Sequence, residues 1–280
     1  MLRPVCALLL VGGAAGAGMT AHNLMAYRAQ QHFEESVPGF EALVATNWPS
    51  ISAGAPFPDY LYVCGDSHDA GEEDHWPPFQ TAAANYIRAN WTLDEVLTEG
   101  TRANRLAAFM IGAVTHYVTD MNWHGIGTVP SPQGFIEQLG VSNFNCSGEL
   151  CQVAHSTADV GGEFVAAWEV NLTFFEPAAW EVPVDDIVRI FAYANATLDP
   201  SQACYGAICF PLVEPEWVSD CAYLFGVGSW AIKEFGAIVY PYWEITAYND
   251  AGAPHLTEAF LGWPVGGVDG EVCFLAGMVL

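Results

Sequence analysis

The chain has 280 residues, enough for one large domain or two small ones, and its 52% hydrophobic content is ample for a buried core. Only 7 Lys and Arg residues oppose 32 Asp and Glu residues, so the formal net charge is −25. A chain this acidic will neither bind a nucleic-acid backbone by counterion release nor adhere to an anionic membrane by charge. Most of the carboxylates are expected at the solvated surface, and bound divalent metals would offset several others locally.

The first residues are predicted to be a secretory signal peptide spanning residues 1–16. Arg3 supplies the positive end, 5–11 are apolar, and the small residues up to Gly16 suit cleavage before Ala17. This run is too short to span a bilayer, and no other stretch is long and apolar enough, so no transmembrane helix is expected. We therefore expect a secreted, extracellular protein with its functional domain in 17–280. Glycosylation sequons that agree with export begin at Asn90, Asn145, Asn171 and Asn195.

The cysteines also fit an oxidising compartment. There are 8, and removal of the signal peptide with Cys6 leaves an odd number, so one is free or pairs outside this chain. The close pairs Cys146/Cys151 and Cys204/Cys209 could each close a small loop. Because no CxxC motif exists, a thiolate zinc site is not expected.

Apolar periodicity predicts a single all-α domain with many helices, and alternating strand patterns are scarce. Pro49 is expected to end the second helix, and Pro56–Tyr60 to be irregular because each proline disfavours helix in the residue before it. Residues 65–73 read as a polar loop, and the chain from Tyr240 onward gives no clear assignment. The predicted helices span 20–33, 37–48, 79–90, 93–100, 103–122, 154–171, 184–195 and 217–239.

The central predicted helix carries the most informative pattern. His116, Asp120 and His124 are spaced four apart, so they lie one above the next on a single helical face. Two imidazoles and a carboxylate on one stripe form an array of metal ligands, and His155 and Asp159 repeat the spacing. The alternative is a capped core helix whose histidines only form hydrogen bonds.

Several other positions offer ligands of the same chemical type. His22 lies shortly after the expected new terminus, and Asp59 lies among prolines. His68-Asp69 and Asp74-His75-Trp76 flank a polar turn. His32 and His255 are isolated, and both are interpreted as structural.

These pieces resemble the superfamily of zinc-dependent phospholipases C and fungal single-strand nucleases. The likeness is greatest to the catalytic domain of glycosylphosphatidylinositol-specific phospholipase D, and it is clear over residues 17–170. The matching segments follow the family's order: Ala17-Gly-Met-Thr-Ala-His22, Phe57-Pro-Asp59, His68-Asp69 with His75-Trp76-x-Pro-Phe79, His116-x3-Asp120-x3-His124, and Ala154-His155-Ser-x-x-Asp159-x-Gly-Gly162.

Some positions separate the branches of this superfamily. In bacterial phospholipases C and fungal nucleases the carboxylate and the last histidine of the central motif are usually six apart. Asp120 and His124 are four apart, as in the phospholipase D branch. Asp159 stands where the bacterial phospholipases have Glu. Ala17 stands where most relatives have a Trp whose backbone amino and carbonyl groups bind metal.

The resemblance implies a site with about three zinc ions. One zinc would be bound by Asp59, His75, His116 and Asp120, and a second by His124, His155 and Asp159. The third would take His22, the terminal amino and carbonyl groups of Ala17, and the other oxygen of Asp120. Asp59 has a second possible role as the base that orients the attacking water. His68 and Asp69 would support the ligands without binding metal themselves.

The resemblance therefore implies a secreted zinc-dependent phosphodiesterase that hydrolyses a phospholipid or glycosylphosphatidylinositol head group by metal-activated water. Trp76, Trp91 and Trp123 are candidates for exposed aromatics that touch lipid or glycan. The alternatives are a single-strand nuclease of the same fold and a non-catalytic zinc-binding secreted protein. The strong negative charge and the four-residue spacing argue against nucleic acid as a partner. The sequence leaves open which P–O bond is cut and the oligomeric state.

Overall fold

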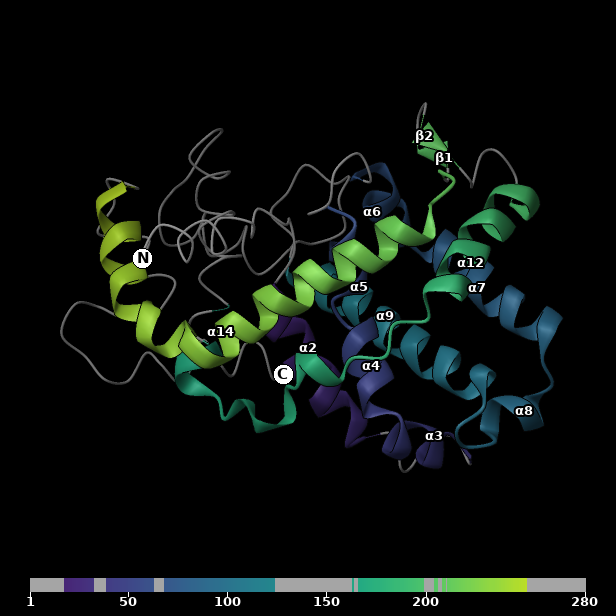
Figure 1. Cartoon of the computed structure of the whole chain (residues 1–280), viewed down its shortest axis with the longest axis horizontal. Helices are drawn as coiled ribbons and strands as arrows, with labels where there is room; N and C mark the ends of the chain where they lie inside the picture. The colour runs from purple at the N-terminus through teal and green to yellow at the C-terminus, as the bar shows by residue number, and fades with distance from the viewer. Residues whose placement is uncertain are drawn as a thin grey trace. The chain divides into compact units, whose positions relative to one another are not determined.

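The computed structural model describes residues 18–32, 39–62, 68–123, 163, 166–198, 204–205, 208–209 and 211–250. The predicted all-α class is confirmed (Figure 1). The described elements are α2 (Met19–Gln30), α3 (Phe40–Thr46), α4 (Trp48–Gly54), α5 (Phe57–Tyr60), α6 (His68–Asp74), α7 (Pro77–Asn90), α8 (Leu93–Leu97), α9 (Arg102–Trp123), η2 (Leu172–Phe174), η3 (Pro177–Ala179), α12 (Val184–Thr197), β1 (Cys204–Tyr205), β2 (Ile208–Cys209) and α14 (Pro215–Asp250).

The described residues fall into two compact units. Those of the first unit lie within 22–117 and 173–230, and those of the second within 15–21, 118–172 and 231–280. Within the second unit, the carboxylate of Glu163 accepts hydrogen bonds from Thr20 N at 2.8 Å and Thr20 Oγ1 at 2.6 Å. In the part of the chain that the structure describes, no helix is both long and apolar enough to cross a membrane.

The prolines of the first unit are the main correction to the predicted elements. Pro49 does not end a helix that runs to Trp48; α3 ends at Thr46 and Pro49 lies in the first turn of α4. Likewise the segment Pro56–Tyr60, predicted to be irregular, contains the single turn α5 with Pro58 near its start. Proline suits the first turn of a helix because the N–H it lacks would have no intrahelical partner there.

Other differences have tertiary causes. Residues 68–74 form α6 although 65–73 was predicted to be a loop, because α6 packs against α5 and α7 and buries Ala70. Helix α14 continues past Tyr240 to Asp250. The short antiparallel pair β1 and β2 was not predicted, and its register sets Cys204 opposite Cys209, the pair expected to close a small loop. Cys221, buried in α14, is disulfide-bonded.

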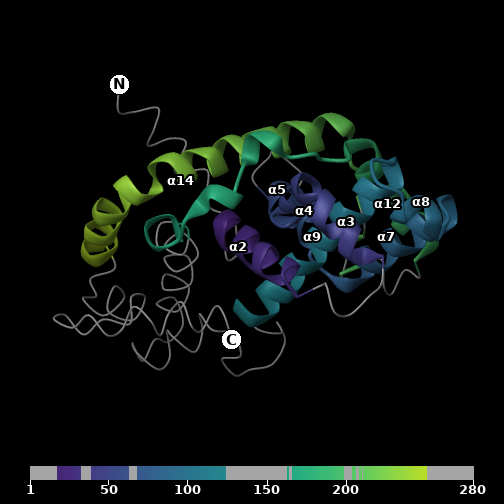
Figure 2. The same cartoon turned by 90° about the horizontal axis from the view of Figure 1, so that it is seen from below.

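Two sets of buried side chains form the core of the first unit. One set is aliphatic and is shared by α2, α3, α4, α8 and α9. Figure 2 labels the ribbons of these five helices. The other set is aromatic. The ring centroid of Phe57 lies 5.1 Å from that of Phe109 and 6.0 Å from that of Phe79. Across the contact of α7 with α12, the ring centroids of Phe79 and Phe191 are 4.8 Å apart. The aromatic set fixes α5 between α7 and α9, and α5 carries Asp59.

Helices α4 and α9 approach each other through two glycines. A Cβ atom at Gly54 would overlap the backbone oxygen of Phe109, and one at Gly112 would overlap that of Ile51. No side chain fits between the two backbones, so they pack in direct contact. This contact places the C-terminal end of α4 beside the middle of α9.

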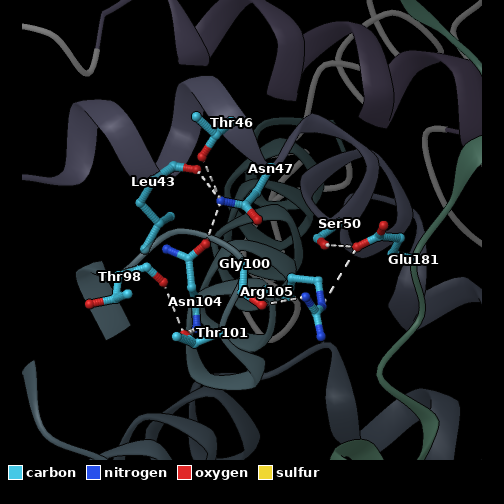
Figure 3. Close-up of polar contacts among 10 residues, drawn as sticks. All are labelled: Leu43, Thr46, Asn47, Ser50, Thr98, Gly100, Thr101, Asn104, Arg105 and Glu181. Atoms are coloured by element: carbon cyan, nitrogen blue, oxygen red, sulfur yellow. Dashed lines mark hydrogen bonds and ion pairs between the residues drawn. The ribbon is translucent and has the colours of Figure 1, made fainter. Parts of the chain in front are cut away.

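A buried pair of amides ties the other end of α9 to the α3–α4 junction (Figure 3). Asn47 Nδ2 donates to Asn104 Oδ1 at 2.8 Å and to Leu43 O at 2.8 Å. Asn104 Nδ2 in turn donates to Val96 O at 2.8 Å. Because buried polar groups are costly when they lack partners, this network fixes how α9 starts relative to α3 and α8.

We expect Asn104→Leu to lower the free energy of unfolding by about 2 kcal/mol, because the buried Val96 carbonyl loses its donor and Asn47 loses an acceptor. Urea unfolding measures this difference. Thr197→Ala, at an exposed position whose hydroxyl donates only to Tyr193 O of its own helix, is the control and should change stability by less than about 0.5 kcal/mol. Equal stability of the parent and Asn104→Leu would contradict a structural role for the amide pair.

Candidate metal centre

Four side chains from different parts of the first unit converge in its interior. His22 comes from α2, Asp59 from α5, His75 from the residue after α6, and His116 from α9. All four are buried. Asp59 lies between two imidazoles, with Oδ1 3.4 Å from His75 Nε2 and Oδ2 3.8 Å from His22 Nε2. Helices α2, α5 and α9, distant in sequence, are labelled in Figure 2.

Asp59, His75 and His116 offer ligand atoms that all lie within 4.8 Å of one another. Two imidazole nitrogens and one carboxylate oxygen are the donor set that zinc binds in proteins, and three protein ligands leave a position open for water or substrate. Three of the four residues that the resemblance implies as ligands of one zinc thus converge here; the fourth, Asp120, does not belong to this group, and metal binding itself stays a prediction.

Backbone carbonyls orient two of these imidazoles. His116 Nδ1 contacts Ala55 O at 2.7 Å, and His75 Nδ1 contacts Gly71 O. A carbonyl can only accept, so in each ring Nδ1–H donates and Nε2 carries the lone pair. Ligand histidines commonly use this arrangement, because the bond to the outer nitrogen fixes both the tautomer and the ring plane. The donor geometry of this centre therefore suits a metal ion.

The ring packing also favours neutral imidazoles. His22 and His116 stack with centroids 3.7 Å apart and planes 13° from parallel, while His75 meets His116 edge to face at 4.8 Å. Two stacked imidazolium ions would repel each other in a buried place. Because a metal binds the neutral ring, stacking and metal binding require the same protonation state.

The carboxylate carries the negative charge of this centre. Burial by itself would raise the pKa of Asp59, but the imidazoles of His116, His75 and His22 in their protonated form outweigh burial and hold the pKa below its ordinary value. Where the rings are neutral, a bound metal cation would take over this role. The group is therefore ionised at neutral pH. Among the described residues no lysine or arginine pairs with this buried anion, and a divalent cation would neutralise such a charge.

Asp74, a candidate ligand that the sequence analysis did not assign to any zinc ion, is a buried carboxyl group next to this centre. Its Oδ1 lies 3.6 Å from His75 Nδ1, and burial raises its pKa well above the ordinary value. The carbonyls of Ala55 and Gly71 were also missed, since backbone atoms leave no residue-type signal. The only sequence trace of the Ala55 contact is the pair of glycines that lets α4 reach α9.

The remaining predicted site residues divide into four groups. Asp120 lies one turn beyond His116 on α9, as its spacing predicted. Asp69 and His32 are exposed, and His68 begins α6. Trp76 is 37% exposed and Trp91 half-buried, but Trp123 is only 4% exposed and cannot serve as the surface aromatic it was expected to be. Ala17, His124, His155, Asp159 and His255 lie outside the described residues.

Comparison with known proteins places these residues in a family context. The chain matches the profile of the zinc-dependent phospholipase C family over residues 21–199. It is 33% identical over 96% of its length to a phosphatidylinositol-glycan-specific phospholipase D of Dictyostelium discoideum, and 28% identical over 90% to that of Bos taurus. It is also 31% identical over 58% of its length to an uncharacterised protein of Saccharomyces cerevisiae.

The chain spans only part of these relatives. It covers 28% of the Dictyostelium protein, 27% of the bovine protein and 23% of the yeast protein. No solved structure matches the chain significantly.

We expect zinc to raise the thermal unfolding temperature of chelator-treated protein, and His116→Ala to abolish most of that increase. Zinc at about a hundred times its Kd stabilises a one-site protein by about 2.7 kcal/mol. The zinc-induced shift is compared within each variant, because loss of the Ala55 contact lowers stability even without metal. His32→Ala, at an exposed histidine, is the control and should keep the full shift. An undiminished shift in His116→Ala would exclude this residue as a ligand.

We expect Gly112→Ala to weaken zinc binding although it changes no ligand. The added methyl group must push α4 away from α9, which moves the Ala55 carbonyl from His116 Nδ1. Zinc affinity measured by competition with a chromogenic chelator should fall by about 10-fold to 100-fold, the usual cost of losing such a supporting hydrogen bond. Gly100→Ala is the control, because a Cβ there meets no atom within 4 Å. Its φ of +75° strains an alanine and can lower stability, so only the zinc affinities of the two variants are compared. Parent-like affinity in Gly112→Ala would show that the helix contact does not orient His116.

Proposed function

The chain belongs to the zinc-dependent phospholipase C family, and we propose that it hydrolyses a phosphodiester in the head group of a phospholipid or glycosylphosphatidylinositol. The observation that carries this proposal is the buried centre in which Asp59 meets His22, His75 and His116. The names of the relatives, which are phosphatidylinositol-glycan-specific phospholipases D, favour a lipid head group over other phosphodiesters.

We propose that these residues form part of a site for about three zinc ions. Asp59, His75, His116 and Asp120 would bind one ion, and His22 would bind another together with the backbone of Ala17. His124, His155 and Asp159 are proposed ligands of the remaining ion. When bound, zinc would supply a water of lowered pKa and positive charge for the phosphate oxygens.

The protein groups have separate tasks in this proposal. The Nδ1 bonds of His75 and His116 keep Nε2 directed at the centre, so little reorganisation is needed on binding. Asp59, ionised at neutral pH, would accept a proton or orient the attacking water from a fixed position on α5. Burial of all four side chains excludes bulk water and strengthens their electrostatic effect.

Export remains part of the proposal. Cleavage of 1–16 would free the amino group of Ala17, which lies five residues before His22 in the sequence. A neutral amine can bind metal, and a metal would in turn hold it deprotonated. In this proposal the protein is secreted, and its full set of metal ligands is present only after the signal peptide has been cleaved.

We expect Asp120→Asn to lower the rate of head-group release by at least about 100-fold while the protein stays folded, because an amide cannot replace a ligand carboxylate. The rate is measured on a glycosylphosphatidylinositol-anchored reporter, phosphatidylcholine and single-stranded DNA in parallel. Asp94→Asn, at an exposed carboxylate, is the control and should retain the parent rate.

Release from one lipid substrate but not from DNA is the expected pattern. Cleavage of DNA alone would replace the proposed function with that of a nuclease. Zinc binding without turnover of any of the three substrates would favour a non-catalytic zinc-binding protein. Parent-like turnover in Asp120→Asn would show that the catalytic centre lies elsewhere.

A further inference from the structure

A groove of about 410 Å³ lies in the first unit between α14 and the segment 177–182. Pro177, Trp180 and Val182 form one wall. Tyr223, Gly226 and Trp230 come from successive turns of α14 and form the other. Neither the sequence motifs nor the proposed metal centre gives this groove a role.

The lining of the groove is mainly apolar. None of the described residues that line it carries a charge, and the indole N–H of Trp180 is already used in a hydrogen bond to Ser52 Oγ at 2.9 Å. At its rim, Tyr223 is 71% exposed and Trp230 45% exposed. Apolar walls with aromatic side chains at the rim suit an apolar ligand that enters from water.

We propose that this groove binds a hydrocarbon chain of a lipid. The choice of a lipid rests on the proposed function, whereas the choice of its hydrocarbon part rests on the lining. A sugar would need several hydrogen-bonding side chains, whereas among the described lining residues only Trp180, Tyr223 and Trp230 carry side-chain polar atoms, and the Trp180 N–H is already used. An anionic head group would need lysine or arginine, and the net charge of −25 opposes its approach.

The groove and the metal centre share structural support. Trp180 stacks on Tyr60 with centroids 5.9 Å apart, and Tyr60 directly follows Asp59 on α5. From the Trp180 side, Ser52 Oγ donates to Asn23 Oδ1 at 2.5 Å, and Asn23 directly follows His22 on α2. Phe225 of α14 also contacts Tyr60, at 5.0 Å. A lipid held in the groove would therefore contact the same packed side chains that position Asp59 and His22.

Gly226 offers a direct way to test this inference. A Cβ at this position would lie 3.8 Å from the ring of Trp180, which is an ordinary contact that needs no movement. Gly226→Ala is therefore the matched control, with helix propensity changed but the groove largely open. Gly226→Phe adds a benzyl group that fills the space between the walls.

The probe is lysophosphatidylcholine with a brominated acyl chain, used below its micelle-forming concentration. Because Trp180 and Trp230 line the groove, the bromine atoms should quench tryptophan emission saturably in the parent and in Gly226→Ala. The affinity in Gly226→Phe should fall at least about tenfold, since each methylene kept out of the groove costs about fourfold. Near-ultraviolet circular dichroism and the unfolding temperature check that all three proteins are folded.

The measurement is made with a chelator present, so it does not depend on catalysis. Equal quenching in all three proteins, or quenching only above the micelle-forming concentration, would overturn the groove proposal. Saturable quenching that Gly226→Phe abolishes would support it, even if no phosphodiesterase activity is found, in which case only the proposed function fails.

Discussion

The contact of α4 with α9 at Gly54 and Gly112 determines much of the geometry around the metal centre. Without side chains between the two backbones, the carbonyl at the end of α4 reaches the imidazole of His116. That bond fixes both the tautomer and the ring orientation of His116, so Nδ1 is occupied by the carbonyl and Nε2 is left for the metal centre. The ring of His116 then supports His22 by stacking and His75 by an edge contact. A steric requirement at two glycines thus governs the orientation of three imidazoles.

The same centre is expensive for the folded state when no metal is bound. An ionised carboxylate and three imidazoles are removed from water, and the contacts of Asp59 with His75 and His22, at 3.4 and 3.8 Å, are longer than good hydrogen bonds. The surrounding structure compensates with a well-packed aromatic set around α5 and with the satisfied amide pair at Asn47 and Asn104. The interactions that stabilise the fold thus surround the centre, whereas the polar groups of the centre itself are arranged for metal binding.

Sequence reasoning predicted the helical class from local spacing, and the family resemblance named the residues that meet at the centre; their binding of metal stays a prediction. The four-residue interval of His116 and Asp120 means one face of a helix in any fold. Sequence reasoning could not predict that Asp59 lies on a helical turn, because the prolines around it are compatible with both the start of a helix and a loop. It also missed α6, whose acidic sequence has no apolar period and whose helix depends on packing against α5 and α7. Contacts through backbone carbonyls, such as Ala55 with His116, depend on tertiary structure alone.

The composition of the chain follows from a division of roles between metal and apolar surface. An enzyme that holds phosphate with arginine and lysine needs a basic site, but a site of carboxylates and imidazoles with bound zinc supplies positive charge from the metal. If the apolar part of the substrate is held by a groove of Trp180, Tyr223 and Trp230, binding does not require attraction to an anionic membrane either. Under these two conditions a lipid phosphodiesterase can carry a net charge of −25 with only 7 basic residues. The acidity then restricts the protein to substrates presented by their hydrocarbon chains and disfavours polyanions such as DNA, which lack such chains and would be repelled at long range.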